Sequence, residues 1–449
     1  MRMKPFSLPD DLLLGSATSA TQIDGCDAGN DWAEWSLSGR IADGSDCLRG
    51  AGHWDRVEED IGLLCGMQHQ IYRMGIEWSR IEPQQGRFDE EVVAHYRREL
   101  QLLVDRGIRP LVTLHHFSCP LWFSRMGGFE SVRAPEIFSA YVRRVITALG
   151  DLASEYITIN EPNVYVTNGY FRGIWPPGKK DLRLAFKVYR NLAHCHAAAY
   201  TAIHETRKTL GFQGRTMAGA AFHIRVFEGA TRRPDDRIAA RLMDHLFQGA
   251  IMKAMTTGRL TWPIGAGRIA GYAGDDRERS FGKDHGNIFA DFLAVNYYSR
   301  SIVRAKGFTD GVHPDSPRND LGWEIYPEGL SLLCRRFHKK FRLPVWITEN
   351  GTCDNDDAFR SRFIYDHLLQ VCALRREEIP VERYYHWSFL DNFEWLDGES
   401  ARFGLVHVDF NDFSRTIKKS GLFYSRLIAV HGVTGEMIRE FLAPDGPAD

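Results

Sequence analysis

Short runs of apolar residues recur along the chain, and each is followed by a polar turn and then by a longer amphipathic segment. The runs are rich in β-branched and aromatic residues, which is typical of buried strands. The longer segments carry apolar residues at helical spacing, with charged residues between them. The pattern predicts eight strands, at residues 12–19, 70–78, 109–116, 156–160, 216–224, 292–299, 344–349 and 383–390.

Several of these predicted strands are almost continuously apolar, as in Val345-Trp346-Ile347. Such strands are covered on both faces, which is typical of parallel sheets flanked by helices. The segments 90–106, 135–149 and 183–209 predict covering helices, and Pro and Gly occur in short connections, not in one long linker. The pattern predicts an α/β fold, a single (β/α)8 TIM barrel with extended βα loops, and residues 1–449 as one catalytic domain.

Polar side chains stand where the predicted strands end. In a β/α barrel these ends meet at one face, where catalytic groups gather. Glu161 follows the fourth strand and Glu349 ends the seventh. A single glutamate at a strand end often only forms an ion pair or contacts a helix N-terminus. Two of them, with Trp, Asn, His and Tyr at the other strand ends, favour glycoside cleavage, which uses a paired acid and carboxylate.

The chain resembles family 1 of the glycoside hydrolases, the β-glucosidase family, over residues 6–441. The resemblance rests on an ordered series of motifs, which is far more specific than any one of them. The motifs are LLLGSATSATQIDG, HWDRVEEDIGLL, YRMGIEWSRIEP, TLHHFSCPLW, TINEP, NGYFRGIWPPG, NYYS, GWEIYPEGL, ITENG, HWSFLDNFEW and RFGLVHVDF.

This resemblance implies that Glu161 is the acid/base and that Glu349 is a nucleophile forming a covalent glycosyl-enzyme. Configuration would then be retained, which requires the two carboxyl groups to lie roughly 5 Å apart. It also implies that Arg73 and Tyr298 support the nucleophile and that Trp323 forms a platform for the aglycone, with an ordinary packed core residue as the alternative for Trp323. The remaining implied sugar-binding residues are Gln22, His116, Phe117, Asn160, Trp387, Glu394, Trp395 and Phe403, with Asn160 on the 2-hydroxyl.

Two positions depart from the family pattern. Asp24 stands where the family usually has Glu, and Glu399 stands where Tyr is common. We expect Asp24 to be structural, and Glu399 to add charge at the pocket rim. The family also contains 6-phosphoglycosidases, but Glu394 would repel a phosphate and argues against that activity. Glucosides, galactosides and fucosides stay open, as does transfer of the sugar to an acceptor other than water.

The adjacent residues His115 and His116 suggest a second hypothesis, a metal-dependent hydrolase. Neighbouring positions on a strand point to opposite faces, so only one of the two can face the pocket. The eight cysteines are scattered singly, without the spacing of a zinc site. We therefore expect no metal and no cofactor.

Composition adds limits to this interpretation. The chain is 44% hydrophobic, and its 56 basic and 58 acidic residues give a net charge of -2, so no field would attract nucleic acid or an anionic membrane. The first residues reach Pro9 and Asp10 before any apolar run long enough for a signal peptide. The sequence predicts a cytoplasmic enzyme that acts on a small β-glycoside or an oligosaccharide, and it leaves the oligomeric state open.

Overall fold

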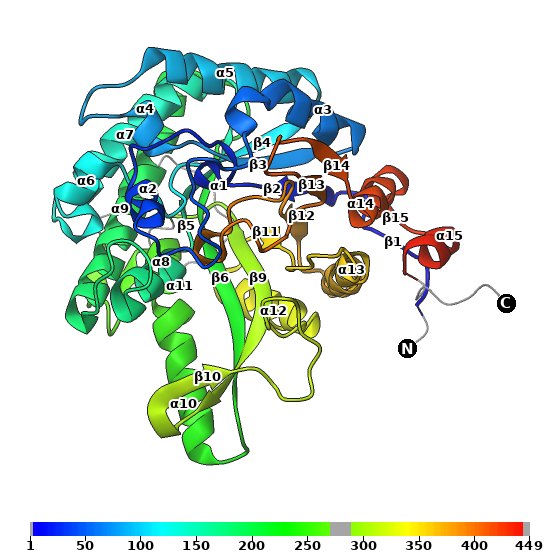
Figure 1. The fold of residues 1–449 in the computed structure, drawn as a ribbon. Helices are drawn as coiled ribbons and strands as arrows, with labels where there is room; N and C mark the ends of the chain where they lie inside the picture. Colours follow the sequence, from blue (N-terminus) through cyan, green and yellow to red (C-terminus); the bar gives the residue numbers. More distant parts are fainter. Residues whose placement is uncertain (1–2, 270–288, 443–449) are drawn as a thin grey trace.

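The computed structural model describes residues 3–269 and 289–442 and contains a closed barrel of parallel strands (Figure 1). The strand order is β9-β11-β12-β2-β3-β4-β5-β6, and β6 pairs with β9 to close the ring. The barrel strands are β2 (Leu13–Ala17), β3 (Ile71–Gly75), β4 (Arg109–Thr113), β5 (Glu155–Asn160), β6 (Met217–Gly229), β9 (Leu293–Arg304), β11 (Val345–Asn350) and β12 (Val381–Trp387). All eight predicted strands are confirmed.

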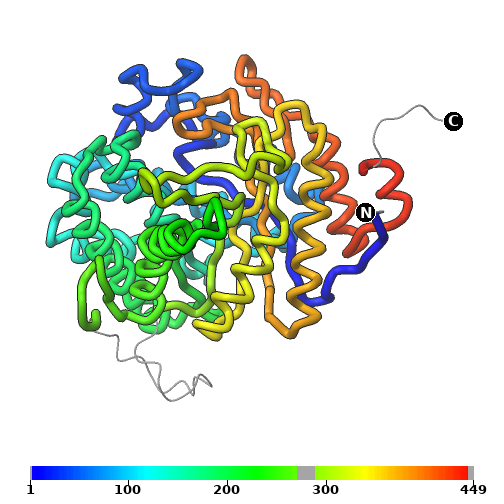
Figure 2. Tube along the Cα trace, turned by 90° about the horizontal axis from the view of Figure 1, so that it is seen from below, coloured from blue at the N-terminus to red at the C-terminus, as the bar shows by residue number. Residues whose placement is uncertain are grey.

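Helices follow the strands and form the outer layer (Figure 2). Asp89 and Asp181 cap the N-termini of two of them, because each carboxylate accepts hydrogen bonds from backbone N–H groups of the first turn. The longer helices, in chain order, are α3 (Val57–Gly66), α5 (Glu90–Asp105), α7 (Ala134–Leu149), α9 (Leu182–Thr209), α10 (Pro234–Asp244), α11 (Ala250–Thr257), α12 (Glu328–Phe341), α13 (Arg360–Arg376) and α14 (Lys419–Val430). The three predicted helices correspond closely to α5, α7 and α9.

The hydrophobic interior has two main parts. One cluster fills the space between the strands and the helices. A second cluster lies inside the barrel, where the rings of Phe292 and Trp346 stack 3.7 Å apart at 15°. This filled interior forms the floor on which the polar site lies, as is usual for such barrels.

Two strands extend beyond the positions predicted for them. The sequence predicted ends at Ile224 and Ser299, but β6 continues to Gly229 and β9 to Arg304, paired with each other along this length. The short strand β10 (Thr309–Gly311) pairs antiparallel with β9, and α10 packs against the same extension, so all three project away from the barrel (Figure 1). The prediction failed because it ended each strand where its buried, apolar run ended.

The two ends of the described chain lie side by side. Strand β1 (Phe6–Ser7) pairs antiparallel with β15 (Gly432–Val433), and both lie on one side of the barrel (Figures 1 and 2). Within the described residues no helix is both long and apolar enough to cross a bilayer.

Candidate active site

A cavity of about 890 Å³ opens at the carboxyl ends of the barrel strands. Many of the residues that the sequence predicted as a site line it. They are His116, Phe117, Glu161, Tyr298, Trp323, Glu349, Trp387, Glu394, Trp395 and Phe403. Gln22, Arg73 and Asn160 are fully buried directly behind this lining and are hydrogen-bonded to it. The structure thus brings together the residues that the sequence analysis selected.

Glu349 is held by a cation and a phenol. Arg73 Nη1 donates to Glu349 Oε1 at 2.6 Å, and the Tyr298 hydroxyl donates to Oε2 at 2.5 Å. Burial raises the pKa of Glu349 to about 7; Arg73 and the Tyr298 hydroxyl oppose this rise, and the charge of Glu161 adds to it. Both oxygens of the carboxylate are therefore fixed by donors that favour its ionised form.

Asn160 connects the two halves of the site. Its side-chain oxygen accepts hydrogen bonds from Arg73 Nη2 at 2.7 Å and from Asn296 Nδ2 at 3.0 Å. Its amide nitrogen lies 2.9 Å from His116 Nε2. Burial and the charge of Arg73 hold the pKa of His116 well below its usual value, so this imidazole is neutral and accepts the bond from Asn160.

Glu161 is held differently. It precedes the short helix α8 (Pro162–Val166) with left-handed backbone angles, φ 43° and ψ 58°. Its Oε1 accepts a hydrogen bond from Asn296 Nδ2 at 2.9 Å and lies 3.3 Å from His223 Nδ1. Phe117 and Trp395 in the same cavity also have positive φ, a conformation that concentrates at functional sites.

His223 and Arg225 were not predicted as site residues. Arg225 donates to His223 Nε2 from its Nε at 3.3 Å and also lies 3.2 Å away through Nη2. Because a guanidinium cannot accept, Nε2 carries no proton, and the proton of the neutral ring sits on Nδ1, which faces Glu161. Burial lowers the pKa of His223 and keeps the ring neutral. The only available sequence signal was two polar residues at alternate positions near the end of an apolar strand.

The opposite wall is aromatic and acidic. His116 stacks on Trp387 and Trp395, at ring separations of 5.8 and 6.0 Å. Glu394 lies beside them and accepts a hydrogen bond from Gln22 Nε2 at 3.2 Å. Its enclosure in the cavity, together with the charges of Asp397 and Glu349, raises the pKa of Glu394 to about 8.

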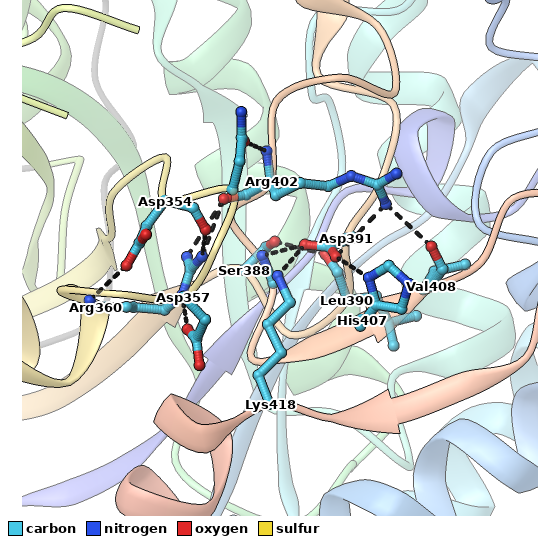
Figure 3. A network of polar contacts seen from close by, with 12 residues as sticks. Asp354, Asp357, Arg360, Ser388, Leu390, Asp391, Arg402, His407, Val408 and Lys418 are labelled. Atoms are coloured by element: carbon cyan, nitrogen blue, oxygen red, sulfur yellow. Dashed lines mark hydrogen bonds and ion pairs between the residues drawn. The ribbon is translucent and has the colours of Figure 1, made fainter. Parts of the chain in front are cut away.

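A buried ionic network supports the loop that carries Glu394 (Figure 3). Asp391 lies 2.7 Å from Lys418 Nζ, 3.3 Å from His407 and 3.6 Å from Arg402. Burial alone would raise the pKa of Asp391, but His407, Lys418 and Arg360 lower it below its usual value. Arg360 joins this loop to the one after β11, because its guanidinium donates to the backbone oxygens of Thr352 and Arg402. The loops after β11 and β12 are thus fixed to each other.

The two departures from the family pattern lie outside this core. Asp24 is buried and accepts from the Tyr96 hydroxyl at 3.2 Å, as expected for a structural role. Glu399 lies 4.0 Å from Arg49, its backbone N–H donates to Ser45 Oγ at 3.3 Å, and it is not among the residues that line the cavity. Burial raises the pKa of Glu399.

His115 and His116 point in different directions. His115 packs against Phe129 and Tyr165, away from the cavity, while His116 lines it. Among the residues that the structure describes, no three His, Cys, Asp or Glu side chains are grouped as metal ligands.

Two buried carboxylates at the ends of β5 and β11, in a cavity walled by aromatic rings, define a barrel hydrolase of the glycosidase class. Comparison with known proteins agrees. The model of glycosyl hydrolase family 1 matches residues 4–433. Beta-glucosidase A of Thermotoga maritima is 31% identical, over 96% of this chain and 100% of that protein.

Solved structures give the same result. A β-glycosidase from Pyrococcus horikoshii superposes with a TM-score of 0.87 and 33% identity, covering 98% of this chain and 99% of that one. A β-glucosidase from Thermotoga maritima in complex with glucoimidazole superposes with a TM-score of 0.85 and 29% identity, covering 95% and 99%. The chain therefore belongs to glycosyl hydrolase family 1 and is a β-glycosidase.

Proposed function

We propose that this protein hydrolyses β-D-glucosides, releasing the terminal non-reducing glucosyl unit with retention of configuration, and that the barrel with its loops acts as one catalytic domain. The observation that carries the proposal is the pair of carboxylates with different partners. Glu349 is bound by Arg73 and Tyr298, whereas Glu161 is bound by Asn296 and His223. A cation beside one carboxylate and only neutral donors beside the other is the arrangement that a nucleophile and a proton donor require.

In the first step, Glu349 attacks the anomeric carbon and forms a covalent glycosyl-enzyme, while Glu161 gives its proton to the departing glycosidic oxygen. In the second step, Glu161 removes a proton from water, which attacks the same carbon and releases the sugar and Glu349. This sequence needs the two carboxyl groups roughly 5 Å apart, which stays a prediction.

The glucosyl unit would lie on Trp387 and Trp395, with Glu394 and Gln22 on its outer hydroxyls. His116 Nδ1 has no hydrogen-bond partner within the described chain and is buried, so a hydroxyl of the sugar can accept from it. Asn160 would hold the 2-hydroxyl through a bond that strengthens as charge develops on the ring. The names of the relatives favour glucose over galactose or fucose.

Transfer of the sugar to an alcohol remains the second candidate, because it shares the same intermediate. The 6-phosphoglycosidase activity is disfavoured, because Glu394 stands where the outer hydroxyls would bind and offers a phosphate no positive charge.

The test compares the wild type with Glu349→Gly and Glu161→Gly on a panel of aryl β-glycosides, with azide added. We expect Glu349→Gly to be inactive alone and to form an α-glycosyl azide, because azide replaces the nucleophile on the opposite face of the ring. The matched variant Glu161→Gly should instead give the β-glycosyl azide, because azide then attacks the glycosyl-enzyme.

The most rapidly cleaved wild-type substrate identifies the sugar, and added alcohol shows the share of transfer. The same azide anomer from both variants, or an active Glu349→Gly variant, would contradict the assigned roles.

A further inference from the structure

The cavity extends well past the carboxylates, into a part walled by apolar side chains. Half-buried aliphatic and aromatic groups line this outer part, among them Phe171, Phe227, Met243, Leu246, Phe247 and Val312. Apolar groups that stay partly exposed on one concave surface are typical of a ligand site. At about 890 Å³, the whole cavity is near the upper end of the range for small-molecule sites, so a single sugar does not fill it.

The outer wall is built by the strand extension described above. Residues 225–229 of β6, at about 3.3 Å per residue, reach roughly 16 Å past the barrel. Phe227 packs against Phe247 at a ring separation of 5.6 Å, and Phe227 and Met243 both pack on the small cluster of Ala239, Ala240 and Val303. Phe227 and Met243 therefore stand on strand β6 and helix α10, which pack against each other (Figure 1).

Several polar groups on this wall are bound to one another. Arg300 pairs with Glu324 and with Glu228, and Ser301 donates to Asp310 at 3.1 Å. Arg225 is bound to His223 and, at 2.9 Å, to Ser301. Where a second sugar met these apolar side chains, it would exchange hydrated hydroxyls for apolar contacts, which is unfavourable when no partner replaces the water.

We infer that the aglycone of this enzyme is an extended apolar group, of which a long alkyl chain is the simplest example, and not a second sugar. The inference rests on the proposed function, because it assigns the leaving-group side of the same site. Aliphatic side chains offer only apolar contact, so affinity should grow with the length of the chain that they cover. The expected gain is about two- to fourfold in kcat/KM for each added methylene until the wall ends.

The experiment measures kcat/KM for ethyl, butyl, hexyl and octyl β-D-glucosides below their critical micelle concentrations. Cellobiose and cellotriose are measured for comparison. The variants are Met243→Gln and Leu246→Gln, which place an amide of similar size on the wall. Leu242→Gln is the matched control, because Leu242 neighbours Met243 on α10 but is 38% exposed and lies outside the cavity lining.

We expect the wild type to favour octyl over ethyl glucoside by at least about 30-fold and to cleave octyl glucoside better than cellobiose. Met243→Gln and Leu246→Gln should flatten this dependence on chain length while ethyl glucoside is cleaved as before, and Leu242→Gln should preserve it.

Three results would overturn the inference: a wild-type kcat/KM that does not change with alkyl chain length, a higher kcat/KM for cellobiose than for octyl glucoside, or the wild-type dependence on chain length in both wall variants. In each of these cases the proposed function survives, because glucosides are still cleaved. If even 2,4-dinitrophenyl β-glucoside is not cleaved, the proposed function fails, and the inference fails with it.

Discussion

Glu349 and Glu161 share one cavity but are surrounded by different kinds of partner. Around Glu349, a guanidinium and a phenol donate to both carboxylate oxygens. Around Glu161, the donors are the Asn296 amide and a neutral imidazole, and the guanidinium of Arg225 lies behind that imidazole.

This difference fits the separate roles that we propose for the two glutamates. A direct cation stabilises the anion and keeps it ready to attack, whereas a proton carrier must gain and lose its proton in each cycle. Placing His223 between Glu161 and Arg225 orients the carboxylate without pairing it with a full charge.

Replacing Glu161 should have the largest effect, and the effect should depend on the leaving group. In Glu161→Gln, kcat/KM for alkyl glucosides should fall by about 10²- to 10⁴-fold, because no acid protonates the glycosidic oxygen. For 2,4-dinitrophenyl glucoside, whose leaving group needs no proton, kcat/KM should fall by less than about tenfold. Initial rates on the two substrates measure this, and equal losses would contradict the acid role.

Tyr298→Phe removes one donor from Glu349 and keeps the ring. We expect kcat/KM to fall by about 10- to 100-fold on every glucoside, because a hydrogen bond to a charged group is lost regardless of the leaving group. Steady-state kinetics on the same two substrates tests this. A loss confined to alkyl glucosides would place Tyr298 with Glu161 instead.

His223→Phe should reduce kcat/KM less than Tyr298→Phe does, and unlike that variant it should affect the substrates unequally. The variant keeps a ring beside Tyr298, on which His223 stacks at 5.7 Å, but loses the donor to Glu161. We expect a loss of about three- to tenfold on alkyl glucosides and almost none on the dinitrophenyl substrate. His223→Gln, which retains an N–H donor, should recover part of the activity. If both substrates lose activity equally, His223 has only a structural role.

The pH profile should show the smallest change. In the proposed mechanism Glu349 reacts as the carboxylate, which forms above its pKa, and a raised pKa places the acid limb of kcat/KM near pH 7. The charge of Glu161 contributes to that rise, so Glu161→Gln should move the limb to lower pH on the dinitrophenyl substrate. The Tyr298 hydroxyl opposes the rise, so Tyr298→Phe should move it to higher pH. Shifts in the same direction would contradict this assignment.

Local pattern was enough to predict much of this molecule. Apolar runs such as Val345-Trp346-Ile347 of β11 indicated the strands, because a strand buried on both faces is apolar along most of its length. The two glutamates could be predicted as site residues because each is a charged residue placed where an apolar run ends. The ordered motifs indicated the family. Arg73 and Asn160 were assigned through the same motifs, without any indication that they contact each other.

The tertiary structure alone decided how these side chains point and what surrounds them. Strict alternation from Trp346, which faces the barrel interior, would turn Glu349 outward, but a register shift between Ile347 and Glu349 brings it inside. A similar irregularity lies between Ile157 and Asn160 in β5. His223, Arg225 and the apolar outer wall depend on how far β6 and β9 pair beyond the barrel. The inward turn of Glu349 and the length of the outer wall both depend on how strands distant in sequence pair with each other. The residue pattern within a single strand carries no information about that pairing.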